Sequence, residues 1–276
     1  MIIGISGKIG SGKDTVGKII QYLINSDLIK EMSFKDFNKS YSQNFLYEHD
    51  WQIKKFASKL KQIVSILTGI PIEDLEKQEI KNKVLGEEWE RWYNYHYKLK
   101  TNNNPKGRLD NYCATQIEVE KQHNLISNSI SEHSFTVEKL TVRKLLQEIG
   151  TDAMRDVIHP NIWINALFSD YKPIGDYPII KEDKYIKDEY IYPNWIITDV
   201  RFPNELEAIK DKKGISIRLE REQEFSMFNE EAISKHSHPS ETALDNAEFD
   251  YVIDNNGTIE ELIEKVKEIL IKEKII

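Results

Sequence analysis

Cysteine and long apolar runs are the two features that this sequence of 276 residues largely lacks. Its single cysteine, Cys113, excludes an internal disulfide framework and a zinc site built from several thiolates, and it suits a reducing compartment. The apolar run after Met1 ends at Ile5, which is too short for the core of a signal peptide, and no other stretch approaches the roughly 20 apolar residues of a transmembrane helix. We therefore expect a cytoplasmic protein that does not cross a membrane.

Positive charge is also in deficit, because 38 basic side chains face 46 acidic ones and leave a net charge of −8. That balance argues against broad, nonspecific binding to nucleic acid or to anionic membranes. With 39% hydrophobic and 30% charged residues, the composition is that of an ordinary globular protein of one or two domains.

Short apolar runs alternate with segments of helical period along much of the chain. The run at residues 2–6 leads into a glycine-rich turn and a helical pattern, and the continuously apolar run at 195–200 indicates a strand covered on both faces. Pro203 opens a further helix, strands follow at 215–219 and 251–253, and Thr258 begins the last helix. This alternation predicts an α/β fold with a parallel sheet and helices on both faces.

The segment of residues 78–134 departs from this alternation, since it is long, polar and helix-leaning. We expect it to form a helical insertion within a single domain that spans residues 1–276. Its aromatic residues at 89–97 are expected to form the packed face of the helical insertion, and the basic residues that follow them are expected to form a solvated loop. A protein or subunit interface is the second interpretation, and nucleic-acid binding is the least favoured.

Residues 7–15 match the phosphate-loop pattern G-x-x-x-x-G-K-[ST] except at its last position, where Asp14 replaces the hydroxyl residue. Backbone N–H groups of such a loop can wrap a polyphosphate, helped by the positive end of the following helix, and Lys13 supplies a cation. Asp14 could hold magnesium directly or through water, or another group could bind the metal. The alternative interpretation of the segment is a plain glycine turn before a helix.

Asp199 and Arg201 stand at the carboxyl end of the buried 195–200 strand, where open α/β sheets place ligand chemistry. An acid and a cation there could orient metal-bound water and clamp a phosphate, with Glu205 one helical turn later. A surface ion pair is the alternative. A GTPase is disfavoured, because neither 38–41 nor 82–85 completes Asn-Lys-x-Asp.

The sequence resembles the deoxynucleoside monophosphate kinases of large tailed bacteriophages in three segments and one tryptophan: 12–15, 142–152, 199–205 and Trp163. Two further segments, 238–241 and 256–262, resemble that family more weakly. The resemblance implies a P-loop nucleoside monophosphate kinase fold and transfer of the γ-phosphoryl group of ATP to a deoxynucleoside monophosphate with Mg²⁺. Known members form dimers, so it also implies a homodimer, located in the host cytoplasm if phage-encoded.

The resemblance also implies a role for each matching residue. The ATP site would comprise Gly7, Lys8, Ile9, Gly10, Ser11, Gly12, Lys13, Asp14 and Thr15, with Asn256, Gly257 and Thr258 at the adenine. The acceptor site would comprise Lys61, Arg143, Gln147, Gly150, Thr151, Trp163, Asp199, Arg201 and Glu205. The catalytic residues would be Lys13, Asp199, Arg201 and Arg221, the last from a lid, and the metal ligands would be Asp14 and Asp199.

Several alternatives stay open at this point. Trp163 could wall a base or pack in the core, Gln147 could read a base edge or cap the backbone, and Arg218 competes with Arg221 for the lid role. Two other functions also remain. One is another small-molecule P-loop kinase, such as a coenzyme-precursor kinase, and the other is a non-catalytic nucleotide-binding regulatory or assembly protein.

Overall fold

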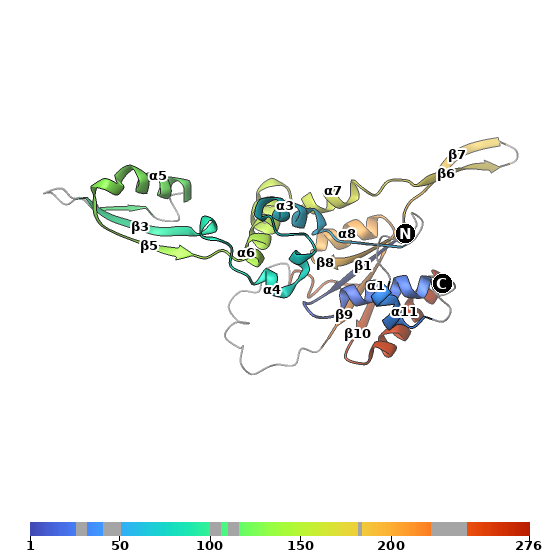
Figure 1. The fold of residues 1–276 in the computed structure, drawn as a ribbon. Coiled ribbons are helices and arrows are strands. Elements are labelled where there is room, and N and C mark those ends of the chain that lie inside the picture. Colours follow the sequence, from blue (N-terminus) through green and yellow to red (C-terminus); the bar gives the residue numbers. More distant parts are fainter. Residues whose placement is uncertain (26–31, 41–50, 100–105, 110–115, 182–183, 222–241) are drawn as a thin grey trace. The chain divides into compact units, whose positions relative to one another are not determined.

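The computed structural model describes residues 1–25, 32–40, 51–99, 106–109, 116–181, 184–221 and 242–276 (Figure 1). The chain divides into two compact units, one formed by Met1–Leu60 with Asp152–Ile276 and the other by Lys61–Thr151. The insertion expected at residues 78–134 falls within the second unit. Each unit is described by itself.

A parallel sheet forms the centre of the first unit, with the strand order β10-β9-β1-β8-β2. The central strand, β1 (Ile2–Gly7), and its neighbour β8 (Trp195–Val200) consist almost entirely of buried residues, as their continuous apolar sequence predicts. The remaining strands are β2 (Gln52–Lys54), β9 (Ile215–Glu220) and β10 (Tyr251–Asp254).

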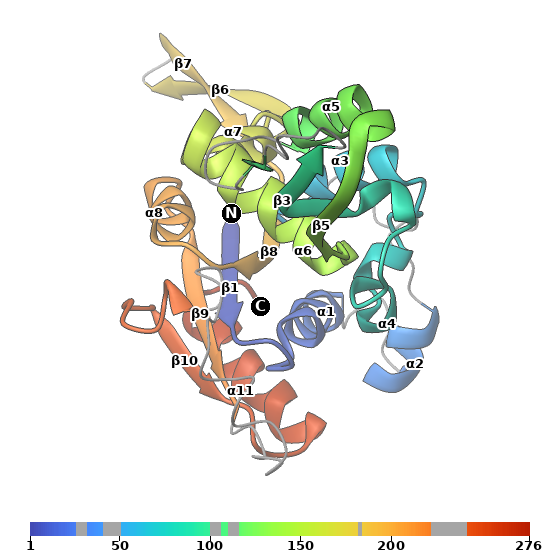
Figure 2. The same cartoon turned by 90° about the vertical axis from the view of Figure 1, so that its left-hand side faces the viewer.

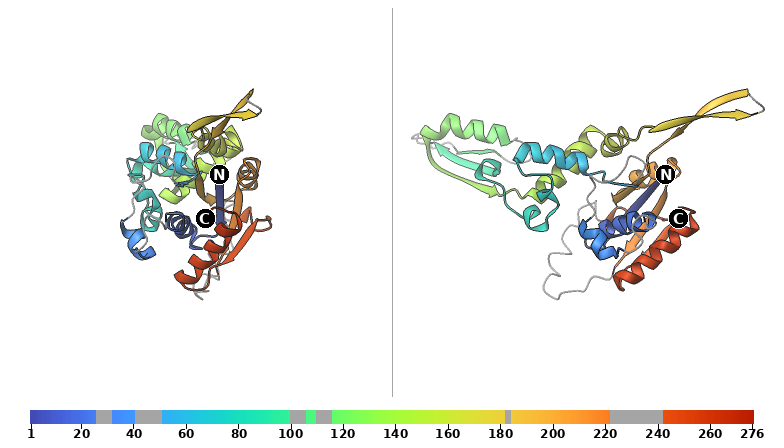
Figure 3. Two further views of the ribbon diagram at one scale, coloured as in Figure 1. Left: turned by 90° about the vertical axis from the view of Figure 1, so that its right-hand side faces the viewer. Right: turned by 45° about the vertical axis from the view of Figure 1, so that its right-hand side comes forward.

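Helices cover both faces of this sheet, as expected. Ile3 and Ile5 of β1 join a core with apolar residues of α1 (Lys13–Ile24) and α11 (Ile259–Lys272), two helices that lie side by side in Figure 3. Gly4 faces the other way, toward Ile209 of α8 (Pro203–Asp211), and Figure 2 shows α8 and α1 on opposite sides of β1. Alternate residues of one strand therefore serve two helical layers.

The first unit also contains α2 (Phe34–Ser40), α7 (Ile162–Phe168) and an antiparallel hairpin of β6 (Gly175–Lys181) and β7 (Lys184–Ile191). Two helices cross the boundary between the units: α3 (Ser58–Thr68) and a π-helix, η5 (Glu148–Ile158). No helix in the described ranges is both long and apolar enough for a membrane crossing.

The second unit is built around an antiparallel sheet of order β4-β3-β5, comprising β3 (Arg91–Leu99), β4 (Lys106–Leu109) and β5 (Ile130–Glu138). Its helices are α4 (Gln78–Lys81), α5 (Gln116–Ile126) and α6 (Val142–Gln147), with short 3-10 turns at Asp74–Glu76, Glu87–Trp89 and Ser127–Ser129. The helical character expected for residues 78–134 is therefore wrong for much of the segment. The aromatic run around Trp92 prefers an extended, pleated backbone, and cross-strand pairing outweighs the helix-leaning composition.

Candidate functional site

The phosphate loop connects β1 to α1 and depends on glycine at two left-handed positions. Gly10 has φ +80° and Gly12 has φ +97°, which residues with a Cβ rarely adopt. A Cβ on Gly12 would also lie 2.8 Å from Nδ2 of Asn255, whereas a Cβ on Gly10 would meet nothing within 4 Å. Glycine is therefore required at both positions by the left-handed backbone, and at position 12 it also avoids a clash with Asn255.

Lys13 begins α1 and folds over the loop, where its Nζ donates to the carbonyl oxygens of Gly7 (2.6 Å) and Lys8 (2.8 Å). Gly12 occupies the N-cap position and has no side chain that could satisfy the first N–H groups of α1. Backbone N–H groups, the positive helix end and an ammonium group thus come together, which suits a polyphosphate.

Asp14 points from the first turn of α1 toward the carboxyl end of β8. Its Oδ1 accepts a hydrogen bond from Oγ1 of Thr198 at 2.7 Å and lies 3.1 Å from Nζ of Lys55. The Asp14 side chain is 65% exposed, so its carboxylate is held by neighbours and remains accessible. Oxygen ligands of this kind suit Mg²⁺, which usually binds one or two carboxylates and keeps several waters. Among the described residues, no group of three or more His, Cys, Asp or Glu side chains forms a ready-made metal cluster.

Asp199 is largely buried at the end of β8 and connects this strand to the beginning of α3. Its Oδ1 accepts from the N–H of Phe56 at 2.8 Å, and its Oδ2 accepts from the N–H of Ala57 at 2.9 Å. Both carboxylate oxygens therefore bind backbone groups of the segment that precedes α3. Such charge-assisted bonds fix the direction of the side chain.

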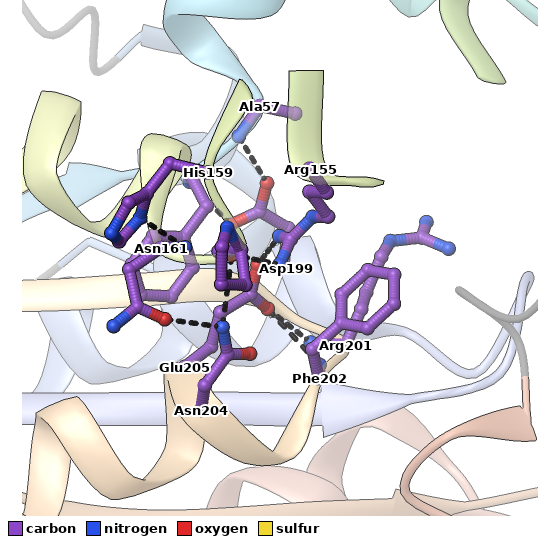
Figure 4. A network of polar contacts seen from close by, with 11 residues as sticks. Ala57, Arg155, His159, Asn161, Asp199, Arg201, Phe202, Asn204 and Glu205 are labelled. Carbon is purple, nitrogen blue, oxygen red and sulfur yellow. Dashed lines mark hydrogen bonds and ion pairs between the residues drawn. The ribbon is translucent and has the colours of Figure 1, made fainter. Parts of the chain in front are cut away.

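Glu205 is buried beneath the turn that joins β8 to α8, with only 1% of its surface exposed. Its Oε2 accepts from the N–H groups of Arg201 (2.7 Å) and Phe202 (3.1 Å), and its Oε1 accepts from Nη2 of Arg155 (Figure 4). Burial raises the pKa of Glu205 to about 7, Asp199 adds to this rise, and Arg155 opposes it. The structure thus places Glu205 inside the turn, while its contact with an acceptor stays a prediction.

The remaining residues predicted from the first unit differ in exposure. Arg221 is exposed just after β9, while Arg218, its competitor, donates to Oγ of Ser6 (3.0 Å) and to Oδ1 of Asp245 (3.2 Å). Trp163 is 5% exposed on α7, which favours core packing over an open wall for a base. Thr15 is half-buried, and the exposed residues include Lys8, Ile9, Asn256, Gly257 and Thr258.

Thr258 caps α11 as expected, because its Oγ1 accepts from the N–H of Glu261 at 3.2 Å. The side chain of Asn256 donates to Oδ1 of Asp254 at 2.6 Å in the turn before this helix. The weaker motif at residues 238–241 lies outside the described residues.

Five predicted acceptor residues belong to the second unit and are described within it. Nζ of Lys61 contacts Oε1 of Glu76, and Arg143 donates to Oδ1 of Asn82 (3.1 Å) and Oε1 of Gln78 (2.7 Å). The other three lie at the end of α6 and the start of η5, where Gln147 is half-buried and Gly150 and Thr151 are buried.

Sequence reasoning missed four polar residues of the first unit that support the loop and the strand end: Lys55, Arg155, Thr198 and Asn255. Asn255 is buried, and its Nδ2 donates to the carbonyl oxygen of Ser11 at 2.8 Å, so it braces the phosphate loop. Asn255 is the first residue of the turn at 255–257 that the sequence did indicate, but its contact with the phosphate loop was not predicted. Arg155 follows the 142–152 motif by three residues, but its partner Glu205 is 50 residues away in sequence.

Comparisons with known proteins found a matching family model and several relatives. The family model described as "Deoxynucleotide monophosphate kinase" matches residues 1–266. The chain is 26% identical over 260 residues to the deoxynucleoside-5'-monophosphate kinase of Escherichia phage T5, covering 88% of this chain and 85% of that protein. It is 27% identical over 130 residues to the deoxynucleotide monophosphate kinase of Escherichia phage RB69, covering 47% of this chain and 45% of that protein. A protein of Acanthamoeba polyphaga mimivirus that provisionally bears the same kinase name is 31% identical over 134 residues, or 46% of this chain and 59% of that protein.

Proposed function

Because this chain belongs to the deoxynucleotide monophosphate kinase family, we propose that its phosphate loop binds the donor ATP and that the end of β8 faces the transferred phosphoryl group. The family establishes the reaction, in which a deoxynucleoside 5'-monophosphate is phosphorylated to the diphosphate. It also favours this reaction over a coenzyme-precursor kinase or a non-catalytic nucleotide-binding protein.

The phosphate loop is the single observation that carries the assignment of the donor site. Gly10 and Gly12 have left-handed backbones, and Lys13 stands beside them at the start of α1 with its Nζ on the loop. Consecutive N–H groups and one cation can neutralise the β- and γ-phosphates of ATP. Residues 7–15 therefore form the proposed phosphate site, and Asn256 to Thr258 form the proposed adenine site.

We propose Asp14 and Asp199 as the carboxylates nearest the magnesium ion that accompanies ATP. Asp14 is the better candidate for a direct ligand, because its carboxylate is exposed and oriented by Thr198. Asp199 uses both oxygens on backbone N–H groups, which suits contact through a metal-bound water. The bound ion would supply charge neutralisation on the phosphate oxygens.

The acceptor phosphate is already ionised at neutral pH, so the reaction needs no strong general base. Positioning and charge neutralisation must supply the rate. We propose that Arg201 and Arg221 neutralise the charge of the transferred phosphoryl group. We propose that Arg143 and Lys61 bind the phosphate of the acceptor. The rest of the proposed acceptor site comprises Gln147, Gly150, Thr151, Trp163, Asp199 and Glu205. Of these, we assign Trp163 and Glu205 to supporting the site, because both are buried.

We further propose that the enzyme works as a homodimer in the cytoplasm. The net charge of −8 and the single cysteine are compatible with that compartment. Light scattering coupled to gel filtration measures the mass of the particle, and a monomer at working concentration would contradict the dimer.

The direct test is a coupled ADP-release assay with ATP, Mg²⁺ and each of dTMP, dGMP, dCMP and dAMP, together with their ribose counterparts. Turnover that requires a deoxynucleotide supports the proposal and reveals the base preference. Turnover without an acceptor, or binding of ATP without turnover, would contradict it.

A further inference from the structure

Two segments of the first unit, residues 155–161 and 199–205, are joined by a network of buried and partly buried polar groups (Figure 4). We call it the Glu205 network. Glu205 is its centre, because one carboxylate oxygen accepts from the backbone N–H groups of Arg201 and Phe202 and the other accepts from Arg155. The turn that carries Arg201 is therefore held from below by a single buried side chain.

Arg155 is held on three sides. Nη2 donates to Glu205, Nη1 lies 3.4 Å from the carbonyl oxygen of Pro160, and the guanidinium carbon lies 3.9 Å from the centre of the Phe202 ring. Only 8% of Arg155 is exposed. A planar, forked cation that stacks on a ring while donating at two nitrogens is a specific property of arginine. With both terminal nitrogens engaged inside the protein, Arg155 acts on its neighbours rather than on a substrate.

A second tie joins the same two segments. Nδ2 of Asn204 donates to the carbonyl oxygen of Pro160 at 3.0 Å and to Oδ1 of Asn161 at 2.7 Å. The N–H of Asn161 in turn donates to Nδ1 of His159 at 3.0 Å. The turn is thus fixed at two points, while the side chain of Arg201 is half-buried and extends away from Glu205 in Figure 4.

We propose that Arg155 is a positioning residue for phosphoryl transfer, which acts through Glu205 to fix the backbone from which Arg201 projects. The proposal rests on the role assigned above to Arg201. A guanidinium group stabilises a transferring phosphoryl group only when its direction is set beforehand, and a displacement of about 1 Å can cost up to about 100-fold in rate. The network sets that direction without contacting the nucleotide.

The test measures the kcat of four proteins: the wild type, Arg155→Lys, Arg201→Ala and the double variant that carries both changes. Lysine keeps the charge but lacks the fork, so we expect kcat to fall by about 10-fold or more, with the KM for ATP nearly unchanged because the phosphate loop is untouched. In the Arg201→Ala background the same change should alter kcat by less than about 2-fold, since Arg155 acts through Arg201. Lys210→Ala, an exposed change on α8, serves as the control.

A second variant protects the test against a folding defect. Arg155→Met combined with Glu205→Gln removes both buried charges at similar volume, which avoids leaving one of them unpaired. Circular dichroism and the thermal midpoint verify the fold, and we expect kcat to fall as in Arg155→Lys.

The outcomes separate the two proposals. Full kcat in both Arg155 variants, beside a loss in Arg201→Ala, would overturn the positioning role alone. Losses that multiply in the double background would also overturn it, because Arg155 would then act independently of Arg201. Wild-type turnover by Arg201→Ala would overturn the role of Arg201 itself and this inference with it.

Discussion

The phosphate loop and the Glu205 network both serve the carboxyl edge of one parallel sheet, yet they are built in opposite ways. The loop consists mainly of backbone from one short segment, and the contacts of Lys13 with it reach back only 5 and 6 residues, although Asn255 braces it from a distance of 244 residues in sequence. The network combines local contacts with side-chain pairs whose partners are distant in sequence. Glu205 reaches Arg155 across 50 residues, and the neighbouring Asp199 reaches Phe56 across 143.

This difference determines what each region tolerates. Added side-chain volume is the main threat to the loop, because Gly12 already lies close to Asn255. A lost or unpaired charge is the main threat to the network, because Arg155 and Glu205 share a site that excludes most water. Substitutions that separate these two sensitivities test the comparison.

Lys13→Ala should have the largest effect, because it removes the cation whose Nζ lies over the loop, on the carbonyl oxygens of Gly7 and Lys8. We expect kcat to fall by about 1000-fold, within the range measured for losing one preorganised charge-stabilising group. Lys18→Ala is the matched control, since Lys18 is exposed on the same helix and its Nζ donates to Asn38. Near-wild-type turnover by Lys13→Ala in the ADP-release assay would remove its assigned role.

Arg201→Ala should have the next largest effect, a fall of about 100-fold in kcat with the fold intact. The side chain is only half-buried, and Glu205 holds the backbone N–H of Arg201, which the substitution leaves in place. Arg201→Lys should recover only part of the rate, because an ammonium group cannot bind phosphate oxygens in the forked manner of arginine. An unchanged kcat in Arg201→Ala would show that the strand end does not face the transferred group.

Gly12→Ala and Gly10→Ala form a matched pair for the loop. Both impose a left-handed backbone on alanine, which costs about 1–2 kcal/mol, but only alanine at position 12 also meets Asn255. We expect Gly12→Ala to unfold at a lower urea concentration than Gly10→Ala. We also expect Gly12→Ala to bind a fluorescent ATP analogue about 10-fold more weakly than Gly10→Ala does. Equal losses in the two variants would show that backbone strain alone, and not the bracing by Asn255, limits the loop.

The same contrast explains how far the sequence alone could lead. The loop, the central strands and α11 were predicted correctly, because their signals lie within a few residues: glycine spacing, continuous apolar runs and the Thr258 cap. Arg155 and Asn255 gave no local signal, because a buried polar side chain is explained only by partners that the fold brings near. The sheet at residues 91–138 was missed for a related reason, since β3 acquires its stability from pairing with β4 and β5.

The smallest expected effect is a dependence of the free energy of unfolding on pH, and it arises from the charge of Glu205. Burial raises the pKa of Glu205 from 4.5 to about 7, with Asp199 adding to the rise and Arg155 opposing it. The native protein therefore keeps this proton to higher pH than the unfolded chain. At pH values between 4.5 and about 7, the native state binds more protons than the unfolded chain. The contribution of Glu205 to the free energy of unfolding therefore falls as the pH rises, by at most about 1.4 kcal/mol per pH unit.

Glu205→Gln removes this titration, so the stability of the wild type relative to the variant should decrease from about pH 5 to about pH 7 and then level off. Urea denaturation across that range measures the difference, and Glu207→Gln, an exposed change on the same helix, serves as the control. A difference that does not vary with pH would mean that Glu205 keeps its charge throughout. The ion pair of Glu205 with Arg155 would then hold the turn that carries Arg201 at every pH in that range. The Glu205 network would in that case be as insensitive to pH as we expect the phosphate loop to be, because that loop consists mainly of backbone.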